Sequence, residues 1–426
     1  MTRTRDARAF LAILALLLIG FLRSAHAQIG LPLPLGCVWP FETTPTTLNV
    51  MYPDSNAIYW TTPYILLPGS QLELNGSFFK ARFLSLDTYN TLGNSISAIY
   101  DKQFPLDSGS QNPFSNPAAE TGSFHVTIVP EPASGGTPPA GTLYGPPINQ
   151  YGFSQGYVVL RAYLPASGTQ ESQLPKITVS LNGFKLKTLS PCTTLQQTVR
   201  LLLFNALVRY WDGKFLAPGQ TEPTEPTFRP PPAANANGAF PNDFNKYIVT
   251  GLTYQRGQIA VIRGKAASFP KTGPNGYPLS MGEDLRYWSM CNYDQVFPFP
   301  VVKQGDIYGC AADVNTGLDA NGYYTYIVAT PQDTPSNALT DKTVTILPWG
   351  NTHLAKALIF RNMLPDPTFV QTTQTANIQC VSQPTVDDMA MCTKAVMGPY
   401  YPVSTYCAKS VYEQGGWQAC FPNKQP

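Results

Sequence analysis

The sequence of Arg82–Tyr89 is RFLSLDTY, and the sequence of Arg286–Tyr293 is RYWSMCNY. Each stretch begins with arginine, has serine three residues later and ends in tyrosine seven residues after the arginine. Farther along the chain, both units close in the pattern Arg-x-x-Leu-Pro, at Arg161–Pro165 and Arg361–Pro365. The offset is 204 residues at the start and 200 at the end. Matches at a nearly constant offset predict an internal repeat.

The two repeat units, about residues 50–185 and 245–366, are predicted to be all-β. Short runs rich in Val, Ile, Tyr, Phe and Thr alternate with clusters of Gly, Pro, Asn and Ser, which is the pattern of strands and turns. Two β-units of this size fit sandwiches or jelly rolls. Expected strands lie at 71–74, 124–129, 157–163, 176–181, 259–262, 323–328 and 343–347.

One segment between the repeats has a helical pattern. Apolar residues in Thr194–Tyr210 recur at helical spacing, and Thr193 or Thr194 can provide the N-cap. A Pro-rich connection follows at 217–239, and a long loop is expected at 130–156. The predicted organisation is a signal peptide (1–27), β-sandwich module one (28–190), a helix with a Pro-rich linker (191–244), β-sandwich module two (245–366) and a disulfide-rich C-terminal cap (367–426).

The first residues predict export. Three arginines precede an apolar run of 14 residues, and Ala25-His26-Ala27 forms a cleavage signal before Gln28. Such a run is too short to span a bilayer, and no later run of about 18 apolar residues follows. We therefore expect a secreted or periplasmic protein with no transmembrane segment after cleavage. Removing residues 1–27 takes away four Arg and one Asp, so the net charge changes from +2 to −1.

Composition excludes several classes of protein. Only 13% of the 426 residues are charged, compared with about 25% in typical soluble domains. No net positive charge is available to neutralise phosphates, so we expect no nucleic-acid partner. The sequence contains no P-loop, dinucleotide fingerprint, H-E-x-x-H or EF-hand pattern. We therefore expect no cofactor, and the oligomeric state stays open.

Cysteine usage agrees with export. An even number of cysteines in an exported chain predicts disulfides, but eight cysteines allow 105 pairings. Four of them lie between 380 and 420, around a predicted short helix at Val386–Met397, which indicates a stapled cap. No C-x-x-C occurs, so no metal site is expected. The predicted disulfide residues are Cys37, Cys192, Cys291, Cys310, Cys380, Cys392, Cys407 and Cys420.

Several short strings resemble those of exported bacterial proteins of unknown function that carry paired β-sandwich modules. They are YWT followed by LPG-x-x-L-x-L-x-G near residues 59–76, R-[FY]-x-S-x-x-x-Y, LPWGN at 347–351 and L-x-x-R-x-x-L-P at 358–365. The chain departs from this group in its Cys-rich tail and in having LPWGN where the group has a turn like NWLPAP. The resemblance implies a β-sandwich fold and no particular activity.

Charged residues that recur in both repeats are the candidates for a site. Arginine binds carboxylates and phosphates in a bidentate manner, so the four arginines are candidate ligand-binding residues. Asp306 or Tyr293 could then act as acid or base. The recurring pairs are Arg82 with Arg286, Asp101 with Asp306, and Arg161 with Arg361.

The other interpretation of these residues is structural. Buried ion pairs fix strand register, and they often contribute to specificity more than to stability. Recurrence in both repeats favours this interpretation, because an active site usually decays in one copy whereas determinants of the fold persist in both.

Three other features allow both a functional and a structural interpretation. Gly152–Gly156 matches G-x-S-x-G, but a strand is expected after it, whereas a hydrolase elbow leads into a helix. His125 and His353 remain after cleavage and lack the close spacing of metal ligands. Aromatic clusters such as Tyr287-Trp288 and Tyr323-Tyr324 fit either core packing or stacking on sugar rings.

The sequence thus predicts an exported β-sandwich protein that binds a small neutral polar ligand, such as a glycan, or a partner in the cell envelope. Whether it is an enzyme stays open. The alternative is a hydrolase acting on glycans or small carboxylates through an Arg/Asp/Tyr site. A third interpretation is an assembly protein, by analogy with paired jelly rolls that form arrays.

Overall fold

A computed structural model describes residues 36–116, 118–166, 173–194, 196–197, 225–231, 240–272, 276–278 and 282–422. The predicted signal peptide lies outside these residues, as do most of the predicted helix at 194–210 and most of the Pro-rich linker. The start of that helix is described: Thr193 accepts a hydrogen bond from the Gln196 backbone N–H, and Gln196 accepts one from that of Thr193. This reciprocal pair is a capping box, so Thr193 is the N-cap.

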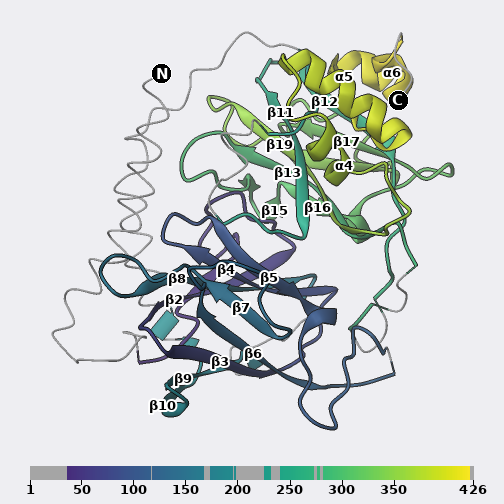
Figure 1. Cartoon of the computed structure of the whole chain (residues 1–426). Coiled ribbons are helices and arrows are strands. Elements are labelled where there is room, and N and C mark those ends of the chain that lie inside the picture. Colours follow the sequence, from purple (N-terminus) through teal and green to yellow (C-terminus); the bar gives the residue numbers. More distant parts are fainter. Residues whose placement is uncertain are drawn as a thin grey trace.

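Module one consists of two five-stranded sheets that share one core. Its outer sheet follows the spatial order β10-β9-β3-β6-β7 and its inner sheet the order β1-β2-β8-β4-β5. Figure 1 shows this module in purple to teal in the lower half of the molecule. The outer strands are β10 (Phe184–Leu189), β9 (Lys176–Leu181), β3 (Ser70–Ser77), β6 (Ser123–Pro130) and β7 (Thr142–Gly145). The inner strands are β1 (Phe41–Thr43), β2 (Ala57–Leu66), β8 (Ser154–Tyr163), β4 (Phe83–Asn90) and β5 (Ser95–Tyr100).

Module two consists of two four-stranded sheets. Its inner sheet follows the order β11-β19-β13-β16 and its outer sheet the order β18-β17-β12-β20. The inner strands are β11 (Asn245–Leu252), β19 (Lys356–Pro365), β13 (Leu285–Asp294) and β16 (Cys310–Ala312). The outer strands are β18 (Val344–Pro348), β17 (Tyr323–Ala329), β12 (Gln258–Lys265) and β20 (Val403–Ala408). A small hairpin joins β14 (Lys303–Gln304) to β15 (Ile307–Tyr308).

The two inner sheets pack against each other, which gives four layers of sheet. Strands β4, β8, β13 and β19 are buried on both faces along most of their length. An aromatic-rich cluster fills the space between the modules and includes Phe83 and Tyr163 from module one with Tyr287 and Met363 from module two. The fold is therefore all-β, as predicted, and the modules share an extensive interface.

The C-terminal residues complete module two. Helices α5 (Val386–Met397) and α6 (Lys409–Cys420) lie at the end of module two that is farthest from module one (Figure 1). Helix α4 (Thr373–Gln379) lies against β11 of the inner sheet, where Thr373 and Asn377 donate to backbone carbonyl oxygens. Strand β20 pairs with β12 and thereby extends the outer sheet. Among the described residues, no helix is both long enough and apolar enough to span a membrane.

All eight cysteines are paired. The disulfides are Cys37–Cys192, Cys291–Cys310, Cys380–Cys392 and Cys407–Cys420. The last two lie in the C-terminal residues, in agreement with the predicted stapled cap. Four disulfides indicate folding in an oxidising compartment.

Candidate functional site

Two of the recurring arginines, Arg82 and Arg286, form ion pairs that cross between the modules. The guanidinium of Arg82, which directly precedes β4, contacts both carboxylate oxygens of Asp313 at 3.1 and 3.2 Å. In the opposite direction, Arg286 of β13 contacts Asp101 at 3.3 Å. Each module therefore supplies one arginine and one aspartate, and each pair has one member on either side of the interface.

Both aspartates also accept backbone hydrogen bonds at matching positions. Asp101 accepts the N–H of Leu84 at 2.9 Å, and Asp313 accepts the N–H of Trp288 at 3.1 Å. Leu84 and Trp288 are separated by the same 204 residues that separate the two arginines. Each carboxylate is thus held by its own module and directed toward the arginine of the other.

Burial dominates the electrostatics of this cluster. Asp101 and Asp313 are completely or almost completely buried. Burial raises the pKa of Asp313 to about 6, although Arg82 and the hydrogen bonds oppose the shift. Burial also raises the pKa of Asp101 against the opposing charge of Arg286, and that of Asp87 against Arg161.

These shifts predict an unusual pH dependence of stability. A carboxyl group whose pKa is higher in the folded state binds more protons there than in the unfolded chain between the two pKa values. Its contribution to the free energy of unfolding is therefore largest below about pH 4 and falls as the pH rises through the folded pKa, about 6 for Asp313. We expect the melting temperature measured by calorimetry to hold or rise when the pH is lowered from 7 to 5. Asp313→Asn should weaken this trend; a steep loss of stability over that interval would contradict it.

The second pair of arginines binds two segments that cross the interface. One precedes β2 and the other precedes β11, and both are called arms below. Arg161 forms an ion pair with Asp87 at 2.7 Å and donates to the carbonyl oxygen of Phe240 at 2.9 Å. Arg361 donates at 2.9 Å to the carbonyl oxygen of Tyr52. Tyr52 precedes module one's strand β2 but contacts module two, whereas Phe240 precedes module two's strand β11 but contacts module one.

Two tyrosines hold the same arms. Tyr293 donates to the carbonyl oxygen of Pro53 at 3.0 Å, and Tyr89 donates to that of Pro241 at 2.6 Å. The guanidinium groups of Arg361 and Arg161 lie over these tyrosine rings at 5.3 and 5.4 Å. Burial raises the pKa of Tyr293 far above its ordinary value, so its hydroxyl stays protonated. Tyr293, which the sequence suggested as a candidate acid or base, is therefore a hydrogen-bond donor inside the interface.

The modules differ at one position in this arrangement. Cys291 lies 204 residues after Asp87 and forms a disulfide with Cys310. Module two therefore has no aspartate of its own at the position of Asp87. Asp54, from the arm of module one, supplies a carboxylate there and accepts a hydrogen bond from the hydroxyl of Ser289 at 2.7 Å. In module one, Ser85 donates to Asp87 at the same distance of 2.7 Å.

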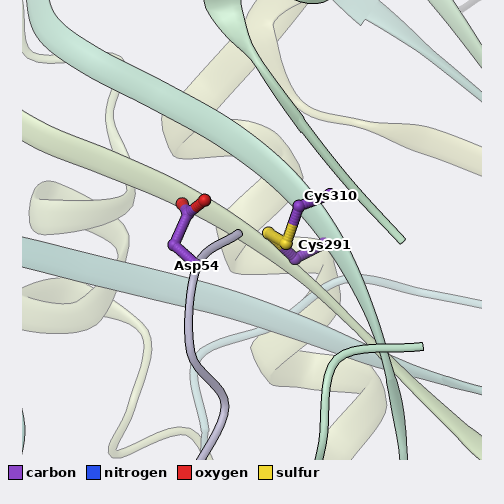
Figure 2. A group of neighbouring side chains, drawn as sticks. All are labelled: Asp54, Cys291 and Cys310. Atoms are coloured by element: carbon purple, nitrogen blue, oxygen red, sulfur yellow. A yellow bond between two sulfur atoms is a disulfide. The ribbon is translucent and has the colours of Figure 1, made fainter. Parts of the chain in front are cut away.

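Asp54, Cys291 and Cys310 lie close together, with potential ligand atoms within 4.8 Å of one another (Figure 2). A thiolate is the form of cysteine that binds metals, and here both sulfurs are joined in a disulfide. The Asp54 carboxylate also accepts the hydroxyl groups of Tyr287 and Ser289. These three residues therefore do not offer a metal-binding set in the oxidised protein.

Asp306 does not occupy the position that matches Asp101. It is exposed in the turn between β14 and β15. Module two inserts this hairpin between Arg286 and its matching aspartate, so that aspartate, Asp313, comes 27 residues after the arginine, whereas the spacing in module one is 19. Sequence spacing alone therefore selected the wrong residue for the match, although both Asp101 and Asp313 begin short 3₁₀ turns.

The remaining sequence candidates are placed as follows. Ser154 of the G-x-S-x-G match is buried at the start of β8 and donates its hydroxyl to the carbonyl oxygen of Pro146. Tyr287, Trp288 and Tyr324 are completely buried, so these aromatic residues pack the interface and the core.

The two histidines lie in different modules. His125 on β6 contacts Asp107 at 3.0 Å in an exposed pair. His353 lies in an exposed loop of module two. The structure therefore does not combine the two imidazoles in one site.

An open hollow lies on module one, and none of the buried arginines lines it. Its volume is about 470 Å³, within the range of ligand sites. Its polar side chains are four hydroxyl groups, the Gln111 amide and the Glu120 carboxylate, and alanine and glycine form the rest of the lining. The lining residues are Ser77, Gly109, Ser110, Gln111, Ala119, Glu120, Thr121, Gly122 and Ser123.

No protein-family model and no curated protein matches the chain. The solved structures that are similar to it include the following two. An uncharacterized protein from Burkholderia cenocepacia has a TM-score of 0.49 and 11% identity, covering 88% of this chain and 82% of that chain. A protein from Vibrio parahaemolyticus has a TM-score of 0.37 and 10% identity, covering 83% of this chain and 90% of that chain. Both similar structures come from bacteria.

Proposed function

We propose that this protein is an exported binding protein that takes a neutral polar ligand, or a partner in the cell envelope, in the open hollow of module one. The observation that carries the proposal is the set of serine and threonine hydroxyl groups and the Gln111 amide in the lining of the hollow. Such groups hydrogen-bond to a hydroxylated ligand without the cost of removing water from several charges.

The placement of the charges supports this proposal. The four arginines that the sequence suggested for binding an anionic ligand are buried inside the protein, so they are not available on the surface. The buried charged residues include Asp54, Arg82, Asp87, Asp101, Arg161, Arg286, Asp313 and Arg361.

No observation favours the hydrolase alternative over binding. Tyr293 is buried and engaged with Arg361 and Pro53, whereas Asp306 is exposed on a hairpin turn. A catalytic acid or base needs access to a bound substrate. Tyr293 is buried and lacks this access, whereas Asp306 is exposed. The proposal therefore contains no catalytic step.

A thermal-shift screen of residues 28–426 tests the proposal. The panel contains neutral sugars, organic acids and divalent metal ions, and we expect a sugar to raise the melting temperature. A ligand at one hundred times its Kd stabilises by about 2.7 kcal/mol. The double variant Gln111→Ala/Thr121→Ala should lose the shift, whereas Gln383→Ala on the exposed cap should keep it.

Two outcomes would contradict this proposal. One is a shift with organic acids or metal ions but with no neutral compound. The other is turnover of the bound compound, which would support the hydrolase alternative.

A further inference from the structure

A pair of aromatic rings lies on the loop between β7 and β8. Tyr151 and Phe153 are nearly parallel, with an interplanar angle of 23° and ring centroids 6.3 Å apart. Tyr151 is 75% exposed, whereas eleven other tyrosines of the described residues are buried. An exposed ring leaves a large apolar area in contact with water, and a ligand that covers it gains the hydrophobic contribution.

The loop is held in one conformation by Asn149. Its side-chain oxygen accepts the backbone N–H of Tyr151 at 2.9 Å, and its own N–H donates to the carbonyl oxygen of Phe153 at 2.9 Å. Gly152 adopts a φ of 82°, in the left-handed region where other residues are strained, and donates its N–H to Asn149. The rings are therefore positioned before any ligand binds, which lowers the entropic cost of binding.

The base of the loop is anchored as well. The hydroxyl of Ser154, the residue that starts β8, donates to the carbonyl oxygen of Pro146 across the stem of the loop. Ser154 is completely buried. The serine of the G-x-S-x-G match thus supports the aromatic loop.

The surroundings of the rings define the chemistry of the ligand. No charged residue occurs between Glu131 and Arg161, so the loop and both flanking segments are neutral. Asn149 and Gln150, two residues with amide side chains, directly precede Tyr151 in the sequence, and both are exposed. A sugar ring combines an apolar C–H face, which suits an aromatic ring, with hydroxyl groups, which suit amides. A charged or purely apolar ligand would match only part of this surface.

We propose that the Tyr151–Phe153 loop is a carbohydrate-binding site at which a sugar ring of a neutral oligosaccharide stacks on Tyr151. The site is formed by residues other than those of the hollow, and it goes beyond the function proposed above. It requires no charge, metal ion or covalent step.

Calorimetric titration with cellohexaose, chitohexaose and maltohexaose tests this site on residues 28–426. We expect at least one of them to bind, and Tyr151→Ala to weaken its affinity by about tenfold or more, as truncation of an aromatic anchor does. Tyr151→Phe keeps the stacking ring and should keep most of the affinity. The matched control is Phe184→Ala, because Phe184 is 77% exposed on a different strand, β10.

Three results would overturn the inference. They are absence of binding by all three oligosaccharides at millimolar concentration, equal binding by the wild type and Tyr151→Ala, and a Tyr151-dependent dimer in sedimentation velocity.

Binding that is lost in Gln111→Ala/Thr121→Ala but kept in Tyr151→Ala would place the ligand in the hollow. The function proposed above would then stand, and the site on the loop would not. Equal melting temperatures for the wild type and the loop variants confirm that the variants fold.

Discussion

Replacing Arg82 by methionine is expected to lower the free energy of unfolding by about 3–5 kcal/mol, the loss typical when one partner of a buried ion pair is removed. Methionine fills much of the same space, but the Asp313 carboxylate then lies buried without its cation. Both side chains are completely buried, so solvent does not screen the loss. Urea denaturation of residues 28–426 measures the difference.

The matched control for this variant is Arg256→Met, because Arg256 is exposed. Surface substitutions of this kind change stability by about 0.5 kcal/mol or less. If Arg82→Met and Arg256→Met had equal effects, the pair between Arg82 and Asp313 would not hold the modules together.

Removing the disulfide between Cys37 and Cys192 by a double substitution to serine should cost about 5 kcal/mol. This disulfide joins residues 155 apart in sequence, and the stabilisation from restricting the unfolded chain grows with the length of the closed loop. It joins the start of the described chain to the segment that follows β10, where Val38 also pairs with Pro191. Calorimetry of the oxidised wild type and the variant measures the difference.

The matched control is Cys380→Ser/Cys392→Ser, because that disulfide closes a separation of only 12 residues. The same relation gives about 3 kcal/mol for a loop of this length. The account predicts a clear difference between the two double variants. A larger loss for the short loop would show that native packing around the C-terminal disulfide matters more than the unfolded chain.

The strands could be predicted from sequence because their residues follow local rules. The runs at 176–181 and 323–328 are rich in Val, Ile, Thr and Tyr, and both form strands. The predicted helix at Val386–Met397 forms with these bounds, because Thr385 caps its start and Gly398 follows its end. The predicted duplication stays a prediction, although contacts at matching positions in the two modules support it.

The interface could not be predicted, because its contacts join residues that are far apart in the chain. Arg82 and Asp313 are separated by 231 residues, and no local pattern relates them. The structural interpretation expected ion pairs that fix strand register. The pair of Arg161 with Asp87 does join the neighbouring strands β8 and β4, whereas the pairs of Arg82 and Arg286 join one module to the other. No sequence pattern identifies Asp54 as the counterpart of Asp87. Asp54 takes this role in module two because the arm of module one crosses the interface.

The exposed aromatic residues also needed the structure. Tyr287, Trp288 and Tyr151 are equally suited by type to stacking on a ligand, yet only Tyr151 remains exposed. Two sheets cover the first two residues, whereas Tyr151 follows a pair of prolines in a neutral loop. Burial of a given aromatic residue depends on which sheets meet, and this is a property of the assembled fold.

The coupling energy between Arg82 and Asp313 is the most direct test of the claim that the recurring arginines hold the modules together. A double-mutant cycle with Arg82→Met and Asp313→Asn isolates this energy, because one residue belongs to each module. We expect a coupling of about 2–3 kcal/mol, with the double variant more stable than the sum of the two single losses implies. Additivity within about 0.5 kcal/mol would contradict it, since the two side chains would then act independently.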